Sequence, residues 1–79
     1  MTRSVQRNRS GFAKRLYDLR FDLGFTQQEV CEQTGVPVST YRRWENGEST
    51  PTMGPYVRAL AGFFRVRPGW LLRGDGDDR

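Results

Sequence analysis

Apolar residues recur at helical spacing from the eleventh residue onward. The first stripe consists of four residues at spacings of four, three and four: Phe12, Leu16, Leu19 and Leu23. This period is that of one face of an α-helix, so the pattern predicts a helix over residues 11–23. Ser10 is suited to cap its start and Gly24 to end it, after which Phe25 should return to the core.

Two short helices joined by a tight turn are predicted next. Thr26 and Glu29 have the spacing of a capping box, which predicts a helix start, and Gly35 favours a helix end. This gives one helix over residues 27–34 and a second over about 38–46. We expect four residues on the inner faces: Val30, Cys31, Tyr41 and Trp44. We expect four others to lie largely outward: Val38, Ser39, Arg42 and Arg43. Two helices so closely connected must pack at a steep angle, as in a helix-turn-helix.

A fourth helix is predicted over about 53–64, with Thr52 as its cap and Pro55 in its first turn, where proline costs little. Its apolar residues keep helical spacing: Val57, Leu60, Ala61 and Phe64. A short fifth helix after Pro68 should carry Trp70 and end at Gly74. Because no stretch alternates as a strand does, the pattern predicts an all-α fold in one domain of five helices, residues 11–74. Residues 1–10 are interpreted as a flexible basic arm and residues 75–79 as an acidic, frayed tail.

The net charge of +4 is unevenly distributed over the 79 residues. Residues 1–20 carry six basic side chains and one acidic, and residues 51–73 carry four arginines and no acid. Between them, Arg42 and Arg43 are the only basic residues against five acidic ones. A basic domain is consistent with nucleic acid as a partner, but adjacent arginines also occur on solvated helix faces. The arginine-rich residues 1–10 have two interpretations of their own: a disordered tail, or an arm that follows the DNA backbone or enters a groove.

Other function classes find little support in the composition. The chain has no histidine, and no cluster with metal-ligand spacing, phosphate-binding glycine loop or nucleophile–base pair is evident, so we expect no enzyme activity, metal or cofactor. No apolar run is long enough to span a membrane, and no signal peptide pattern is present. The single cysteine, Cys31, favours the reducing cytoplasm and is interpreted as a small buried residue.

One long stretch resembles a known family. Residues 23–47, LGFTQQEVCEQTGVPVSTYRRWENG, are similar to the helix-turn-helix of the lambdoid phage repressor, Cro and XRE-type bacterial regulators. The flanking sequences LRFDLG and VRPGWLL extend the resemblance to about residues 11–73. It implies a five-helix bundle of the lambda-repressor-like type, with the second and third helices as the helix-turn-helix. It also implies a regulator of transcription that binds double-stranded DNA with its third helix in the major groove.

The resemblance assigns roles to particular residues. The base-reading set is Val38, Ser39, Arg42 and Arg43, with Arg43 as the first choice and Arg42 placed on either a base or a phosphate. The phosphate-binding set is Arg20, Gln27, Gln28, Asn46 and Gly47. Arg20, which periodicity alone leaves as either a solvated flank or half of a buried pair, matches an internal ion pair with Glu45.

The family pattern also implies a repressor that binds a palindromic operator as a homodimer, with no small-molecule ligand. Val66 and Trp70 are the predicted dimer contacts, although Trp70 could equally close the core. The alternative function is a protein-interaction module, such as an antitoxin, antirepressor or bridging factor, that uses the fourth and fifth helices.

Five positions depart from the family pattern. Pro37 offers no side-chain cap to the third helix, and Val38 can contact only a thymine methyl group or the shape of the groove. Glu48 stands where basic residues often meet phosphate, which should weaken that contact. Gly54 and Pro55 make an unusual start to the fourth helix.

Overall fold

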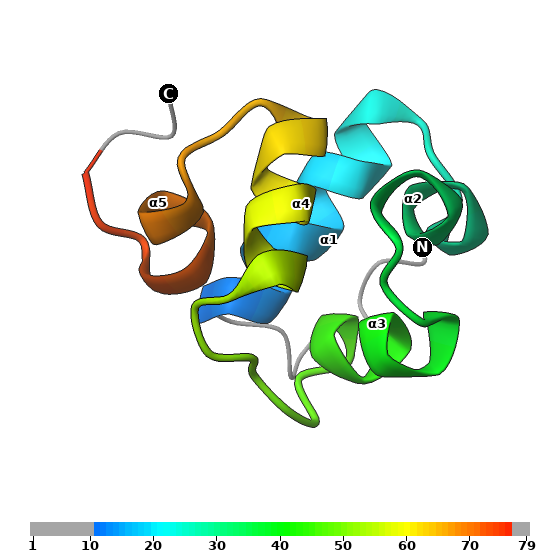
Figure 1. Cartoon of the computed structure of the whole chain (residues 1–79), viewed down its shortest axis with the longest axis horizontal. Helices are drawn as coiled ribbons and strands as arrows, with labels where there is room; N and C mark the ends of the chain where they lie inside the picture. The colour runs from blue at the N-terminus through cyan, green and yellow to red at the C-terminus, as the bar shows by residue number, and fades with distance from the viewer. Residues whose placement is uncertain (1–10, 77–79) are drawn as a thin grey trace, which may run out of the picture.

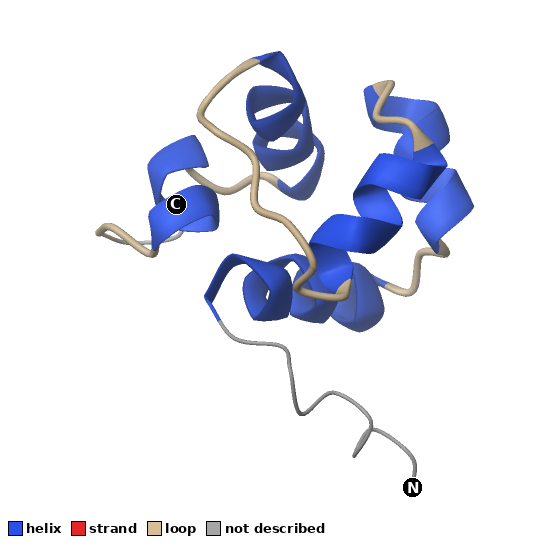
Figure 2. Ribbon diagram, turned by 90° about the horizontal axis from the view of Figure 1, so that it is seen from below, coloured by secondary structure: helices blue, strands red, loops and turns tan. Residues whose placement is uncertain are grey.

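Five helices surround one core in the computed structural model, which describes residues 11–76 (Figure 1). They are α1 (Gly11–Leu23), α2 (Gln27–Thr34), α3 (Val38–Glu45), α4 (Pro55–Phe64) and α5 (Pro68–Arg73). Loops join the helices, and the described residues contain no strand (Figure 2). The prediction of an all-α, five-helix fold is therefore confirmed. The predicted N-terminal arm, the Ser10 cap and the last three residues of the acidic tail lie outside the described residues.

The capping signals position α2. Thr26 Oγ1 accepts the amide of Glu29 at 3.0 Å, and Glu29 Oε1 accepts the amide of Thr26 at 2.9 Å, which completes the predicted capping box. At the other end, Gly35 has φ 83° and its amide bonds to the carbonyl of Cys31 at 2.8 Å. The left-handed conformation at Gly35 turns the chain sharply toward α3.

Two helix boundaries differ from the prediction. Asn46 is the C-cap of α3 and not its last residue. The prediction that α4 begins at about residue 53 after a Thr52 cap is wrong, because its N-cap is Gly54 and its first residue is Pro55. The physical reason is Pro55 itself: a proline ring disfavours helical geometry in the residue before it, and Gly54 is fully extended, with φ −173° and ψ −166°.

The core is made by one face of each helix. Among the residues predicted to be inside, these are buried: Phe12, Leu16, Val30, Cys31, Tyr41, Trp44, Val57, Leu60, Ala61 and Phe64. Leu23 departs from the prediction, since it is 54% exposed although it continues the stripe of α1. Val38 departs in the opposite sense, since it is half-buried and packs against the core. Both residues lie at a helix end. There the spacing of apolar residues no longer predicts whether a side chain is buried.

Arg15 ties α5 to α1. Its Nε donates to the carbonyl of Leu71 at 2.9 Å and its Nη2 to that of Leu72 at 3.0 Å. Its guanidinium also lies 5.8 Å from the ring centroid of Trp70. Because the last carbonyls of a helix lack intrahelical partners, this contact satisfies two of them from another element. Burial lowers the pKa of Arg15, an effect that Asp75 opposes.

Candidate nucleic-acid interface

The outer face of α3 carries the side chains predicted to read bases. Ser39, Arg42 and Arg43 are exposed, whereas Tyr41 and Trp44 on the same helix are buried. Two arginines and a hydroxyl thus point away from the core on adjacent turns of one helix. Val38 is partly withdrawn into the core, which leaves little of its side chain available for a base contact.

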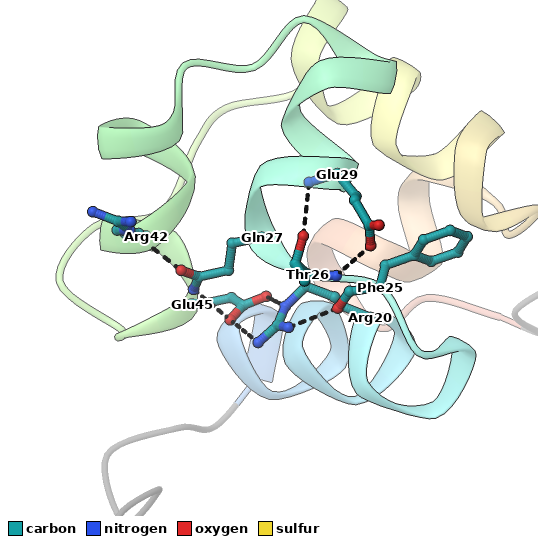
Figure 3. Close-up of polar contacts among 7 residues, drawn as sticks. All are labelled: Arg20, Phe25, Thr26, Gln27, Glu29, Arg42 and Glu45. Carbon is teal, nitrogen blue, oxygen red and sulfur yellow. Dashed lines mark hydrogen bonds and ion pairs between the residues drawn. The ribbon is translucent and has the colours of Figure 1, made fainter.

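A buried ion pair joins α3 to α1 (Figure 3). Arg20 Nε donates to Glu45 Oε2 at 2.7 Å, and Arg20 Nη2 donates to Glu45 Oε1 at 3.0 Å. The Glu45 side chain is fully buried and that of Arg20 is 15% exposed. Arg20 Nη1 also donates to the carbonyl of Phe25 at 2.8 Å, and the guanidinium lies 5.3 Å from the Tyr17 ring centroid. The two helices are therefore fixed relative to each other by a two-pronged, charge-assisted contact.

Gln27 extends this contact from the core to the surface of α3 (Figure 3). Its Nε2 donates to Glu45 Oε1 at 3.0 Å, and its Oε1 accepts from Arg42 Nε at 3.3 Å. A carboxylate can only accept, so Glu45 fixes which end of the Gln27 amide faces inward. The amide oxygen is then left to face Arg42. A chain of hydrogen bonds thus links the buried carboxylate to an exposed arginine of α3.

The start of α2 lies beside this chain. The amides of Gln27 and Gln28 precede the first intrahelical bond, which runs from Val30 to Thr26. Such amides, together with the helix dipole, favour an anion at this end. The Gln28 side chain is directed to Glu32 on its own helix, with Nε2 and Oε2 3.3 Å apart. The structure therefore brings Arg20, Gln27, Arg42 and Glu45 together but leaves the Gln28 side chain out of the group.

The other end of α3 holds a separate set of predicted residues. Asn46 and Gly47 are exposed, and Gly47 takes φ 78° as the chain leaves the helix. Glu48 Oε1 lies 4.0 Å from Arg43 Nε, and both side chains are more than half exposed. Glu48, where the family pattern often has a basic residue, thus lies next to the arginine expected to contact a base.

Burial and charge shift the pKa of three groups around the pair. Desolvation alone would lower the pKa of Arg20, but its hydrogen bonds to Glu45 and the charge of Glu45 raise it overall. Burial, and then the Glu45 carboxylate, raise the pKa of both Tyr41 and Cys31. The phenol and the thiol beneath α3 therefore remain neutral near pH 7, and Arg20 remains charged.

Sequence reasoning missed the contacts of two residues, Gln27 and Arg15, that shape this region. The predicted phosphate residue Gln27 also accepts from Arg42 and donates to Glu45, and no local spacing signals a contact across 15 or 18 residues. Arg15 was not singled out, although it binds the end of α5. Of the two predicted dimer contacts, Val66 is half-buried, and Trp70 packs against the core beneath Arg15.

These features define a helix-turn-helix protein: two short helices, a tight turn at Gly35 and an exposed second helix held to α1. Comparison with known families agrees, because residues 16–71 match a family described as helix-turn-helix. The chain belongs to that family, the lambda-repressor or XRE type, whose members are DNA-binding transcription regulators. A search of curated proteins finds no match.

Residues 11–76 contain neither a metal-ligand cluster nor a membrane-spanning helix. Within that range, no three His, Cys, Asp or Glu side chains are grouped so that they could hold a metal ion. None of the helices there is long and apolar enough to cross a membrane.

Proposed function

We propose that the chain is a sequence-specific repressor that binds a palindromic operator in double-stranded DNA as a homodimer, in the cytoplasm. Residues 11–74 form the DNA-binding unit, and residues 1–10 form a basic arm. In each protomer α3 enters the major groove, with Ser39 and Arg43 directed to base edges. The forked guanidinium of Arg43 matches the O6 and N7 acceptors of guanine.

The observation that carries this proposal is the contact between Gln27 and Arg42. Gln27 supplies a free backbone amide at the start of α2, and its side chain contacts Arg42 on the exposed face of α3. The anion site and the base-reading surface are therefore adjacent. In this proposal Gln27 and Gln28 bind one backbone phosphate through their amides, and Asn46 with Gly47 binds another. Arg20 has N–H groups beyond those bonded to Glu45 and Phe25, and these are directed to phosphate.

Selection of bound duplexes from a random DNA pool, with the full chain, tests the proposal. We expect an enriched palindrome whose half-site centres lie about 10 base pairs apart, one turn of DNA. Affinity for that site should fall steeply as salt rises, because neutralised phosphates release counterions. A variant with Ser39, Arg42 and Arg43 all replaced by alanine is the matched control and should enrich no site.

Enrichment of no sequence, or an affinity that is flat with salt, would contradict the proposal. Failure to bind DNA combined with tight binding of a protein would point instead to the interaction module. Enrichment of a single half-site without symmetry would support sequence-specific DNA recognition and contradict the palindromic operator.

A further inference from the structure

The Gln27 side chain orients Arg42 without neutralising its charge (Figure 3). Gln27 Oε1 accepts from Arg42 Nε at 3.3 Å, and Arg42 forms no ion pair with any residue in the described range 11–76. An amide oxygen accepts a hydrogen bond but has no net charge, so Arg42 keeps its full positive charge. The contact uses the Nε–H, which leaves the N–H groups of the two terminal nitrogens for another acceptor.

Arg43, the next residue along α3, has a different kind of neighbour. Its Nε lies 4.0 Å from Glu48 Oε1, and both side chains are more than half exposed. At that distance the two charges attract each other without a hydrogen bond that would fix the arginine. This contact therefore lets Arg43 turn toward a base edge, whereas a hydrogen bond holds Arg42 at α2.

The two arginines also lie on different edges of the exposed face of α3. Residues four apart on a helix are neighbours, so Arg42 follows Val38 and Arg43 follows Ser39. Val38 is half-buried against the core, whereas Ser39 is exposed. Arg42 therefore shares the edge of α3 that lies against the protein, and Arg43 shares the outer edge.

The buried Glu45 carboxylate determines how the Gln27 side chain is oriented. Gln27 Nε2 donates to Glu45 Oε1 at 3.0 Å, so the amide oxygen of Gln27 faces outward to Arg42. Arg20 holds the same carboxylate with two hydrogen bonds. The direction of Arg42 is therefore set by a group that is itself fixed where α1 packs against α3.

Arg42 is thus held beside the first turn of α2. The backbone amides of Gln27 and Gln28 precede the first intrahelical bond there. In the proposed function these amides bind one backbone phosphate. A guanidinium whose terminal N–H groups are available can contact the same phosphate, because its fork matches two phosphate oxygens.

We propose that Gln27 is a positioning residue, which holds Arg42 at the backbone phosphate next to the start of α2 and away from the bases. Base reading is then left to Ser39 and Arg43. The inference rests on the proposed function for the position of that phosphate. It goes further by assigning Arg42 to the DNA backbone and by giving the Gln27 side chain a role that is separate from its backbone amide.

The experiment measures binding of the full chain to the selected operator and to random duplex, by fluorescence anisotropy at several salt concentrations. Arg42→Ala should weaken binding to both duplexes about tenfold, because a phosphate contact carries no sequence information. It should also reduce the steepness of log K against log salt by about 0.9, the value for one phosphate contact.

Gln27→Ala separates positioning from a merely structural role. The variant removes no charge and keeps its backbone amide, yet it should also reduce the steepness of the salt dependence, because Arg42 is no longer held at the phosphate. A smaller fraction of folded protein would lower the apparent affinity equally at every salt concentration, and circular dichroism measures that fraction. Gln27→Met, which keeps the length of the side chain, replaces this variant if Gln27→Ala is unfolded.

A double-mutant cycle on random duplex tests whether Gln27 acts through Arg42. Gln27→Ala should weaken binding about threefold or more in the wild-type background, and by less than about 1.5-fold where Arg42 is already alanine. Gln33→Ala removes the same amide from an exposed position of α2, and Arg73→Ala removes an exposed positive charge at the end of α5. Both controls should leave the affinity within about twofold and the salt dependence unchanged.

A loss confined to the operator in Arg42→Ala would make Arg42 a base-reading residue and overturn the proposal. An unchanged salt dependence in Gln27→Ala would do the same, and so would an equal effect of Gln27→Ala in both backgrounds. These results would leave the proposed DNA recognition intact. Conversely, a chain that selects no operator but gives the expected salt dependence and coupling on random duplex would refute the proposed function alone.

Discussion

Arg20 on α1 binds both carboxylate oxygens of Glu45 on α3, at 2.7 and 3.0 Å, with the carboxylate entirely inside the protein. Removing a carboxylate from water is costly, and three hydrogen bonds, two from Arg20 and one from Gln27, offset that cost here. The pair orients α3, because Glu45 is the last residue of that helix. Its loss should therefore affect both folding and DNA recognition.

Replacing Glu45 with Gln should lower the free energy of unfolding by about 3–5 kcal/mol, because Arg20 is left largely buried without its counter-charge. Urea unfolding followed by circular dichroism measures this. An Arg20→Met, Glu45→Met double variant should be more stable than either single variant, since no buried charge then lacks a partner. The control is Lys14→Ala, which removes an exposed pair with Asp18 and should cost about 0.5 kcal/mol or less. A double variant as unstable as Glu45→Gln would contradict this account.

Arg43→Ala should weaken binding to the selected operator by about 5- to 150-fold, the equivalent of about 1–3 kcal/mol for one bidentate base contact. Binding to random duplex should change little, because a base contact carries sequence information and a phosphate contact does not. Titrations of both duplexes, monitored by fluorescence anisotropy, give the comparison. Arg73→Ala removes an equal charge from an exposed side chain at the end of α5 and should alter neither affinity. An equal loss on both duplexes would remove Arg43 from the base-reading set.

Periodicity and capping predicted the helices well because both are local. The capping box of Thr26 and Glu29, the left-handed Gly35 and the apolar stripe of α4 need only residues within about one turn. Leu23 shows the limit of this approach: its spacing places it on the inner face of α1, but its side chain is 54% exposed. Spacing describes one helix and not what packs against it.

The site was predictable only where a family pattern could be recognised. Composition and spacing alone left Arg20 as either a solvated flank or half of a buried pair, because its partner lies 25 residues away. The Gln27–Arg42 contact and the Arg15 contacts at α5 were missed for the same reason, since they depend on how separate helices meet. The start of α4 was a different kind of error, because the effect of Pro55 on Gly54 is local and could have been applied.

Arg15→Ala should loosen α5 selectively. The variant loses the charged donor to the carbonyls of Leu71 and Leu72, and hydrogen bonds to charged groups contribute about 2 kcal/mol. Where α5 exchanges by local opening, its amides should exchange with solvent about 30-fold faster, while those of α2 change less. Hydrogen–deuterium exchange measured by NMR resolves the two helices. The adjacent Lys14→Ala serves as the control and should leave α5 unchanged. Equal acceleration in α2 and α5 would show that Arg15 supports the whole fold and not α5 in particular.

Cys31 should make the protein less stable as the pH rises above about 8.5, the ordinary pKa of a cysteine thiol. Burial and the nearby Glu45 raise the pKa of this thiol in the folded state. The unfolded chain therefore loses the proton first, and the folded state binds more protons in that range. The contribution of Cys31 to the free energy of unfolding is complete below pH 8.5 and is lost as the pH rises toward its folded pKa, with a slope of at most about 1.4 kcal/mol per pH unit.

Urea unfolding of the wild type and Cys31→Ala between pH 7 and pH 9.5, under reducing conditions, measures this pH dependence. Tyrosine, with an ordinary pKa of about 10, ionises only in part over that range, and both proteins share its contribution, so their difference reports Cys31. Cys31→Ala should lose this slope, whereas an identical pH dependence in both proteins would show that the thiol does not titrate differently on folding.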